Sequence, residues 1–232
     1  MITSTALLIS LLGGILPAVV WLLFWLREDR KRPEPRDLII FAFVFGMVAV
    51  PLVIPFQRWT MMPGNQLMEF FLWASIEEIF KLGVAYIAVL WRKEDDEPID
   101  PLIYMVTVAL GFAALENVLF IIQPLLDNNV AESLLTGNIR FIGANLLHTI
   151  ASAAIGIAIG LSFYKGTFTK QVYLFFGVTI AIILHTAFNF FIIMEAPSVT
   201  LITLGFVWTA IVVLMLFFEK IKKVYPINTI EN

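Results

Sequence analysis

The sequence predicts an all-α fold, a polytopic membrane helix bundle of about seven transmembrane helices. Of the 232 residues, 60% are hydrophobic, and the mean hydropathy is +0.91. Soluble domains have an apolar share of only about 45–50%. Apolar stretches long enough to cross a bilayer as helices, which takes roughly 20 residues, follow one another along the chain. We therefore expect residues 1–232 to form one integral membrane domain in a lipid bilayer.

Seven apolar stretches account for most of the chain. They are residues 4–26, 38–56, 66–91, 102–123, 139–164, 171–194 and 200–218. The first is interpreted as a retained span and not as a signal peptide, because no Lys or Arg precedes it and its apolar run is too long. The connections are short, the longest being residues 124–138, so no second domain is expected.

Lys and Arg alternate between the connections, which predicts the orientation. The loops after the first, third and fifth stretches, together with the tail, hold twelve of them, whereas the opposite loops hold only Arg58 and Arg140. Cytoplasmic loops accumulate positive residues. The pattern predicts a multi-pass protein of the plasma membrane, with its N-terminus outside and its C-terminus in the cytoplasm.

Composition excludes several functions. The net charge of −3 offers no basic surface for nucleic acid, so no nucleic-acid partner is expected. The chain has no cysteine, which removes thiolate catalysis and Cys-type metal sites. It also lacks His-Glu-x-x-His, Gly-x-Ser-x-Gly and any aspartate inside a predicted span. Catalysis, if present, would use glutamate and histidine.

Several polar residues lie where the bilayer should be. Each ionisable side chain in hydrocarbon costs about 3 kcal/mol on insertion scales and normally faces a bundle interior or a water-filled cavity. Away from their ends, the predicted spans contain six such residues and three amides beside them: Glu77, Glu78, Lys81, Glu116, His148 and His185, with Asn117, Asn145 and Asn189.

Depth and helical phase predict that these residues converge. At a rise of 1.5 Å per residue, Glu77, Glu116, His148 and His185 lie about 10 to 17 Å from the outer ends of their spans. Spacings of three and four residues place each set on one helix face. Gly156 and Gly160 form a small-residue strip suited to close helix packing. We expect one packed polar centre, near the middle of the membrane or in its outer half.

The polar motifs resemble those of the PrsW family of intramembrane proteases. They are Glu77-Glu78-Ile-Phe-Lys81, Gly111-Phe-Ala-Ala-Leu-Glu116-Asn117, His148 and His185-Thr-Ala-Phe-Asn189. The related CAAX-processing and bacteriocin-immunity (CPBP) membrane proteases would have arginine and phenylalanine where this chain has Leu82 and Ala144. The resemblance implies an endopeptidase that cleaves membrane-anchored proteins, such as anti-sigma factors, at site 1 on the outer side.

One mechanism uses glutamate directly. Two adjacent carboxylates in low dielectric cannot both ionise easily, so one is expected to act as a base toward water. We expect Glu77, or else Glu78, to be this base, with His148 and Glu116 positioning the water. His185 and Asn189 would stabilise the oxyanion. Supporting roles fall to Lys81, which would hold the glutamate pair, and to Asn117 and Asn145.

The alternative mechanism uses zinc. Candidate ligands are His148, His185, Glu77 and Glu116, because two histidines and a glutamate form a familiar catalytic zinc set. The sequence leaves the cofactor as none or zinc, and the adjacent glutamates slightly favour the metal-free version. Buried Glu and His also form proton relays, so a proton-coupled transporter or channel is the second function considered, and a non-catalytic scaffold is the third.

The orientation can be tested with reporter fusions. Reporters placed after residues 30, 95, 167 and 225 should read cytoplasmic, and those after 60, 130 and 196 external, because positive loops stay inside. Two consecutive loops on the same side would contradict the topology and the common depth of the polar residues.

Overall fold

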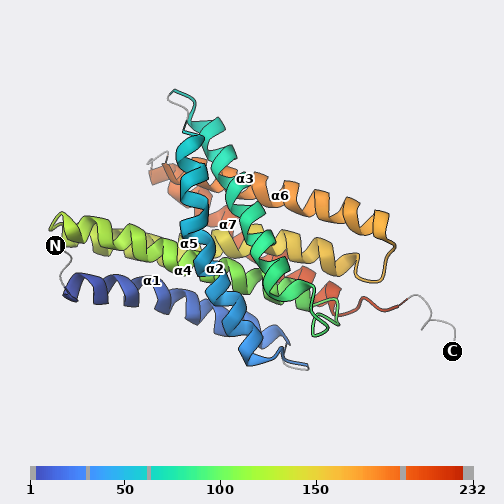
Figure 1. Cartoon of the computed structure of the whole chain (residues 1–232). Helices are drawn as coiled ribbons and strands as arrows, with labels where there is room; N and C mark the ends of the chain where they lie inside the picture. Colours follow the sequence, from blue (N-terminus) through green and yellow to red (C-terminus); the bar gives the residue numbers. More distant parts are fainter. Residues whose placement is uncertain (1–3, 30–31, 62–63, 194–196, 227–232) are drawn as a thin grey trace.

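The computed structural model describes residues 4–29, 32–61, 64–193 and 197–226. The regular elements in this part of the chain are all helices, with no strand, which confirms the all-α prediction (Figure 1). The elements are α1 (Ser4–Trp25), the 3-10 turn η1 (Leu26–Asp29), α2 (Arg36–Trp59), α3 (Gln66–Ala85), the π-helical turn η2 (Tyr86–Leu90), α4 (Asp100–Leu126), α5 (Val130–Leu161), α6 (Thr167–Ile193) and α7 (Pro197–Ile221).

Five helical segments of the described chain are long and apolar enough to cross a membrane. They are Ser4–Asp29, Arg36–Trp59, Asp100–Leu126, Gly143–Leu161 and Thr167–Phe190. α3 is not among them, and its sequence contains Glu77, Glu78 and Lys81. The chain is therefore a multi-pass membrane protein, while the count of seven spans stays a prediction.

The long outer connection predicted at residues 124–138 is wrong. α4 continues to Leu126 and α5 begins at Val130, so only three residues connect them. The side chain of Asn129 caps α5 by accepting the backbone N–H of Glu132 at 3.1 Å, and Asn128 adopts a positive φ of 57° in the turn. The cap explains the early start of α5, since Asn is among the most favourable N-cap residues.

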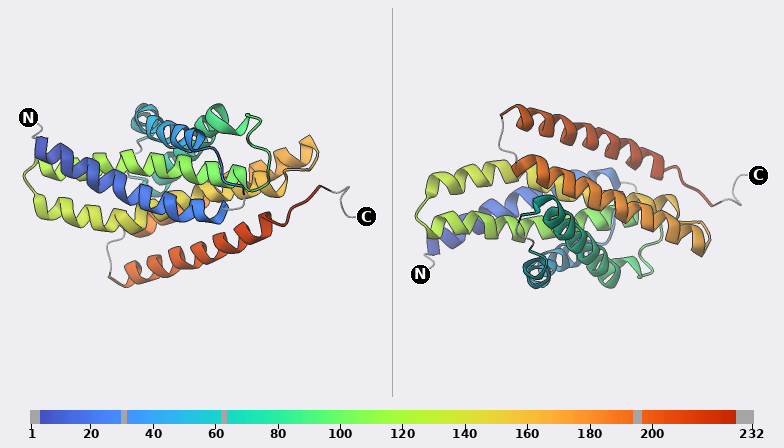
Figure 2. Two further views of the ribbon diagram at one scale, coloured as in Figure 1. Left: turned by 90° about the horizontal axis from the view of Figure 1, so that it is seen from below. Right: turned by 90° about the horizontal axis from the view of Figure 1, so that it is seen from above.

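α4 lies at the centre of the bundle. α1, α5 and α6 run roughly alongside it, whereas α2 and α3 cross the others steeply (Figure 1). α7 covers the side of the bundle opposite α2 and α3 (Figure 2). Because α4 is enclosed in this way, an unbroken run of its residues from Asp100 to Ala114 is buried.

Glycines bring α2 and α5 into backbone contact with α4. A Cβ atom on Gly46 of α2 would lie 2.1 Å from the carbonyl oxygen of Val108, and one on Gly156 of α5 would lie 2.6 Å from Leu102 Cα. Gly160, one turn further along α5, approaches Pro98 equally closely. The predicted Gly156 and Gly160 strip is thus a helix contact, of the kind that drives helix association in lipid.

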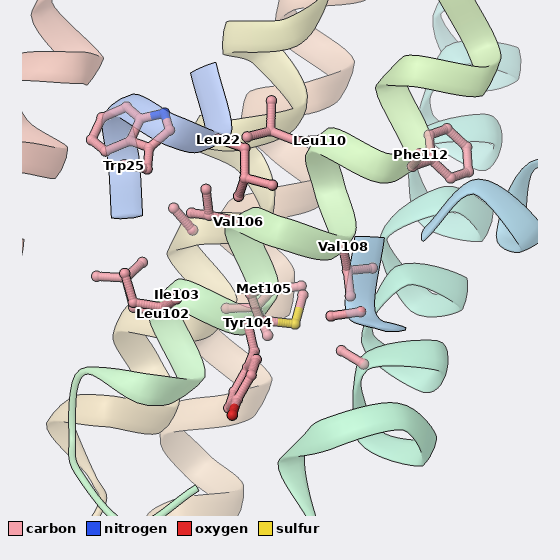
Figure 3. Packing of buried hydrophobic residues seen from close by; sticks show 14 of the residues in the cluster. Leu22, Trp25, Leu102, Ile103, Tyr104, Met105, Val106, Val108, Leu110 and Phe112 are labelled. Atoms are coloured by element: carbon pink, nitrogen blue, oxygen red, sulfur yellow. The ribbon is translucent and has the colours of Figure 1, made fainter. Parts of the chain in front are cut away.

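The apolar core surrounds α4 and extends to α1 and α7. Figure 3 shows Leu22 and Trp25 of α1 beside the buried residues of α4. The Trp25 ring stacks on Phe218 of α7, with the centroids 5.5 Å apart. The core therefore holds α4 rigidly, and α4 carries Glu116 and Asn117 into the polar centre.

Candidate functional site

Four helices bring the polar residues of the predicted spans together. α3 supplies Glu77, Glu78 and Lys81, and α4 supplies Glu116 and Asn117. α5 adds Asn145 and His148, and α6 adds His185 and Asn189. Side-chain contacts link the charged residues and the histidines, and Arg140 connects Asn117 and Asn145 to Glu116. Asn189 lines the same cavity as Glu77, Glu116 and both histidines.

Glu78 is an anchor between three helices. It is completely buried, and its Oε1 accepts hydrogen bonds from Lys81 Nζ at 2.7 Å and from His185 Nδ1 at 2.8 Å. Its Oε2 accepts the hydroxyl of Ser152 on α5 at 2.7 Å. Both carboxylate oxygens are therefore engaged, and the bond to His185 fixes which nitrogen of that ring carries its proton.

Glu77 lies differently from its neighbour. Its Oε1 accepts the side-chain amide of Gln57 on α2 at 2.8 Å. Its Oε2 is buried and has no hydrogen-bond partner in the described chain. This oxygen lies 3.6 Å from His185 Nε2, 3.7 Å from Lys81 Nζ and 4.0 Å from His148 Nδ1. A buried carboxylate oxygen without a donor is costly, so Glu77 presents a reactive or ligating atom.

His148 is held from both sides. Its Nε2 lies 3.0 Å from Glu116 Oε2, and its Nδ1 lies 2.8 Å from Lys81 Nζ. An ammonium only donates, so Nδ1 accepts and the Nε2 proton goes to Glu116. The His148 and His185 rings meet edge to face, with centroids 5.1 Å apart. Each histidine thus has one nitrogen on a carboxylate and the other directed toward Glu77.

Glu77, His148 and His185 form a candidate metal centre. One ligand atom of each lies within 4.8 Å of the others, and all three residues are buried. Elsewhere in the described chain no other group of three His, Cys, Asp or Glu residues meets this condition. Glu116, the fourth candidate from the sequence, instead contacts the far nitrogen of His148.

A cavity of about 410 Å³ opens beside these residues. Its wider walls are apolar, and its polar part is formed by Gln57, Glu77, Glu116, Arg140, both histidines and Asn189. The apolar lining comprises Val50, Val53, Ile54, Phe70, Phe112, Leu119, Phe120, Ala144, Leu147 and Phe188, with Trp73 beside them. The cavity suits an apolar peptide segment that passes beside the few polar side chains of the site.

The family follows from comparison with known proteins. The model of the PrsW family, described as intramembrane metalloproteases, matches residues 34–218. The chain belongs to the PrsW family. It is 27% identical over 188 residues to a Protease PrsW of Geobacillus kaustophilus, covering 78% of each chain. A Protease PrsW of Clostridioides difficile is 28% identical over 191 residues, again with 78% of each covered. No solved structure matches.

Membership in the PrsW family confirms the resemblance seen in the motifs. It also supports a membrane peptidase, which acts on protein substrates in a lipid environment, over the transporter considered from sequence.

Sequence reasoning assigned no role in the site to Arg140 of this PrsW-family chain. Its guanidinium forms an ion pair with Glu116, donates to Asn117 Oδ1 at 2.6 Å and lies over the Phe120 ring at 3.9 Å. The sequence pattern could have indicated that Arg140 belongs to the site, because Arg140, Ala144 and His148 follow one another at four-residue spacing and so share one helix face. The prediction counted Arg140 with the outer loop, although it is the second residue of the predicted stretch 139–164.

Gln57 was also missed, because it lies one residue beyond the predicted end of its span. Asn117 and Asn145, predicted as supporting residues, lie next to each other in the structure. The Asn117 side chain contacts Asn145 Oδ1 at 3.4 Å, and Asn145 donates to the carbonyl oxygen of Arg140 at 3.1 Å. These two amides therefore connect α4 to α5 beside the polar centre.

Lys81→Met tests the electrostatic balance of the site. Removing one partner of a buried ion pair leaves Glu78 charged without its cation, so the free energy of unfolding should fall by about 3–5 kcal/mol. Thermal unfolding of purified protein in detergent measures this. The matched control is Lys93→Met, at an exposed position after η2, which should change stability little. Equal stability of the two variants would contradict the pairing.

Proposed function

We propose that this PrsW-family protein is an intramembrane endopeptidase that hydrolyses a peptide bond of a membrane-anchored protein beside Glu77. The observation that carries the proposal is the buried, unpartnered Oε2 of Glu77, which faces two histidines at the polar end of a largely apolar cavity. A general base or metal ligand must have such a free lone pair.

The residues fit a divalent metal of the zinc type. Metal-binding histidines usually donate their second N–H to a carboxylate or carbonyl, which fixes the tautomer. His185 has Glu78 in this position and His148 has Glu116, while Glu77 would complete a set of two histidines and one glutamate. Such a metal, when bound, polarises a carbonyl and lowers the pKa of a water.

The remaining roles follow from contacts of the chain. Glu78 and Glu116 orient the two imidazoles, and Arg140 in turn holds Glu116. Glu78 is a poor candidate for the base, because both of its oxygens already accept hydrogen bonds. Asn189 and Arg140 line the cavity and are the available donors for an oxyanion. His185 serves this role less well, since its proton already goes to Glu78.

One contact favours the metal-free alternative. Lys81 Nζ donates to Nδ1 of His148 at 2.8 Å, which is the nitrogen a metal beside Glu77 would take. In that version Glu77 removes a proton from water directly, and Lys81 keeps His148 neutral and oriented. The two versions differ in whether Nδ1 of His148 binds a lysine or a metal.

The proposed substrates are membrane-anchored regulatory proteins, such as anti-sigma factors cleaved at site 1. The apolar cavity walls suit a segment at the edge of a substrate span. The positive-inside pattern, which puts the N-terminus outside and the C-terminus in the cytoplasm, would place this cleavage near the middle or outer half of the membrane.

Glu77→Gln tests the proposed base or ligand. It keeps the shape and the hydrogen bond to Gln57 but removes the carboxylate, so cleavage of a co-reconstituted single-span substrate should fall by about 10²–10⁴-fold. Expression and thermal stability should be unchanged, which distinguishes lost chemistry from lost folding. Glu69→Gln, in the first turn of the same helix, is the control. Normal cleavage by Glu77→Gln would place the base elsewhere.

Metal content decides between the two versions. If a metal is bound, purified protein should contain close to one equivalent, and His148→Ala and His185→Ala should each lose metal and activity together. A chelator should then inactivate the wild type, with zinc restoring it. Metal analysis by mass spectrometry is independent of activity. Active protein without metal, insensitive to chelators, would establish the direct glutamate mechanism.

A further inference from the structure

A second group of buried acids lies at the opposite end of α4 from Glu116. Asp100, the first residue of α4, has no exposed surface, and Asp29 at the end of η1 is only 5% exposed. Glu34 and Asp95 are partly buried beside them. Asp100 and Glu116 are separated by about 24 Å along the helix. This group, here called the acidic cluster, is therefore distinct from the Glu77 site.

Backbone donors hold the acidic cluster in place. Asp100 Oδ2 accepts the backbone N–H groups of Asp96 and Glu97 at 2.9 and 2.6 Å. Asp29 accepts the backbone N–H of Glu34, and the carboxylate of Glu34 accepts the Tyr104 hydroxyl. Three separate segments are joined by these bonds: η1 with the residues after it, the turn before α4, and α4 itself.

Three buried oxygens of the cluster lack a hydrogen-bond donor in the described part of the chain. Oδ2 of Asp29, Oδ1 of Asp95 and Oδ1 of Asp100 are all buried without a hydrogen-bond partner in the described chain. Asp100 lies close enough to Glu34 for a contact between the two carboxyl groups. No salt bridge formed by the described residues includes any of the four acids. Arg32 and Lys222 form salt bridges with Glu97 and Glu28 instead. Lys222 and Lys170 also attract Asp29 and Asp95, but without forming a salt bridge to them.

Such an arrangement requires a positive charge or a proton. Taking carboxylates out of water costs free energy unless a charge or a donor compensates for the lost hydration. Buried carboxylates that are not neutralised by side chains commonly coordinate metal ions. Oxygen-only donors select hard cations such as Mg²⁺ and Ca²⁺ over zinc.

We propose that the acidic cluster binds a hydrated divalent cation of the Mg²⁺ type, with Asp29 and Asp100 as its principal ligands. Mg²⁺ usually keeps several waters and takes only one or two carboxylates from the protein. Three side chains of the cluster do not meet the distance condition for direct ligation that Glu77, His148 and His185 meet, so waters would supply most of the ligands. Glu34 and Asp95 complete the site through water.

The cation would join η1, the turn before α4 and the start of α4 into one rigid end of the bundle. The Lys and Arg distribution predicts that this end faces the cytoplasm, where Mg²⁺ is abundant. The proposal does not depend on the peptidase function, since no residue of the Glu77 site takes part.

The test is thermal unfolding of full-length protein in detergent, titrated with MgCl₂ after chelator treatment at alkaline pH. The wild type should gain stability saturably. Asp29→Asn and Asp100→Asn keep the shape and the hydrogen-bond acceptors, so each should weaken the apparent Mg²⁺ affinity at least about tenfold. Without Mg²⁺ both variants should equal or exceed the wild type, because each removes a repulsive charge, and Mg²⁺ should reverse that order.

Two control variants distinguish the acidic cluster from the Glu77 site and from exposed charges nearby. Asp96→Asn changes an exposed charge in the same turn, and Glu77→Gln alters the other site; both should keep the wild-type Mg²⁺ response. If one Asn variant does not fold, Mn²⁺ binding to the other, counted by paramagnetic resonance, gives the same answer. A wild type indifferent to Mg²⁺, or stabilised only by acid, would overturn the proposal and show a cluster neutralised by protons. An unchanged Mg²⁺ response in both Asn variants would overturn it too.

Discussion

Glu78 is a charged side chain with no exposed surface, and its bonds come from α3, α5 and α6. In an apolar bundle a carboxylate can be buried only if other groups take the place of its hydration shell. Lys81, Ser152 and His185 do this together. The relative positions of three helices, and with them the directions of both imidazoles, therefore depend on satisfying one charge.

The two neighbouring glutamates divide structure and reactivity between them. Successive helix residues point in directions about 100° apart, so Glu78 faces α5 and α6 while Glu77 faces the cavity and α2. The satisfied carboxylate holds the site together, and the unsatisfied one is available to a ligand or a proton. His148 shows the same division. Glu116, itself held by Arg140, fixes one nitrogen of the ring, while the other nitrogen faces Glu77.

α4 connects the two polar regions of the molecule. Close glycine contacts with α2 and α5 leave no room for α4 to shift, and its buried apolar length separates Glu116 from Asp100. A cation at the acidic cluster would stabilise the start of α4, and the core would transmit that rigidity to Glu116 through a continuous helix. α4 thus carries Asp100 at its first residue and Glu116 in its second half, with a buried apolar stretch between them.

The sequence by itself determined the helical membrane fold, the family and nearly all members of the polar centre. Hydrophobic length, helical phase and the cost of charge in lipid act locally, and so they can be read from the order of residues. Only the tertiary structure distinguished Glu77 from Glu78, moved Arg140 and Gln57 into the site and gathered Asp29, Glu34 and Asp100. Those outcomes depend on how helices cross and on which lone pairs remain free after packing, and neither is encoded in the spacing of residues along one helix.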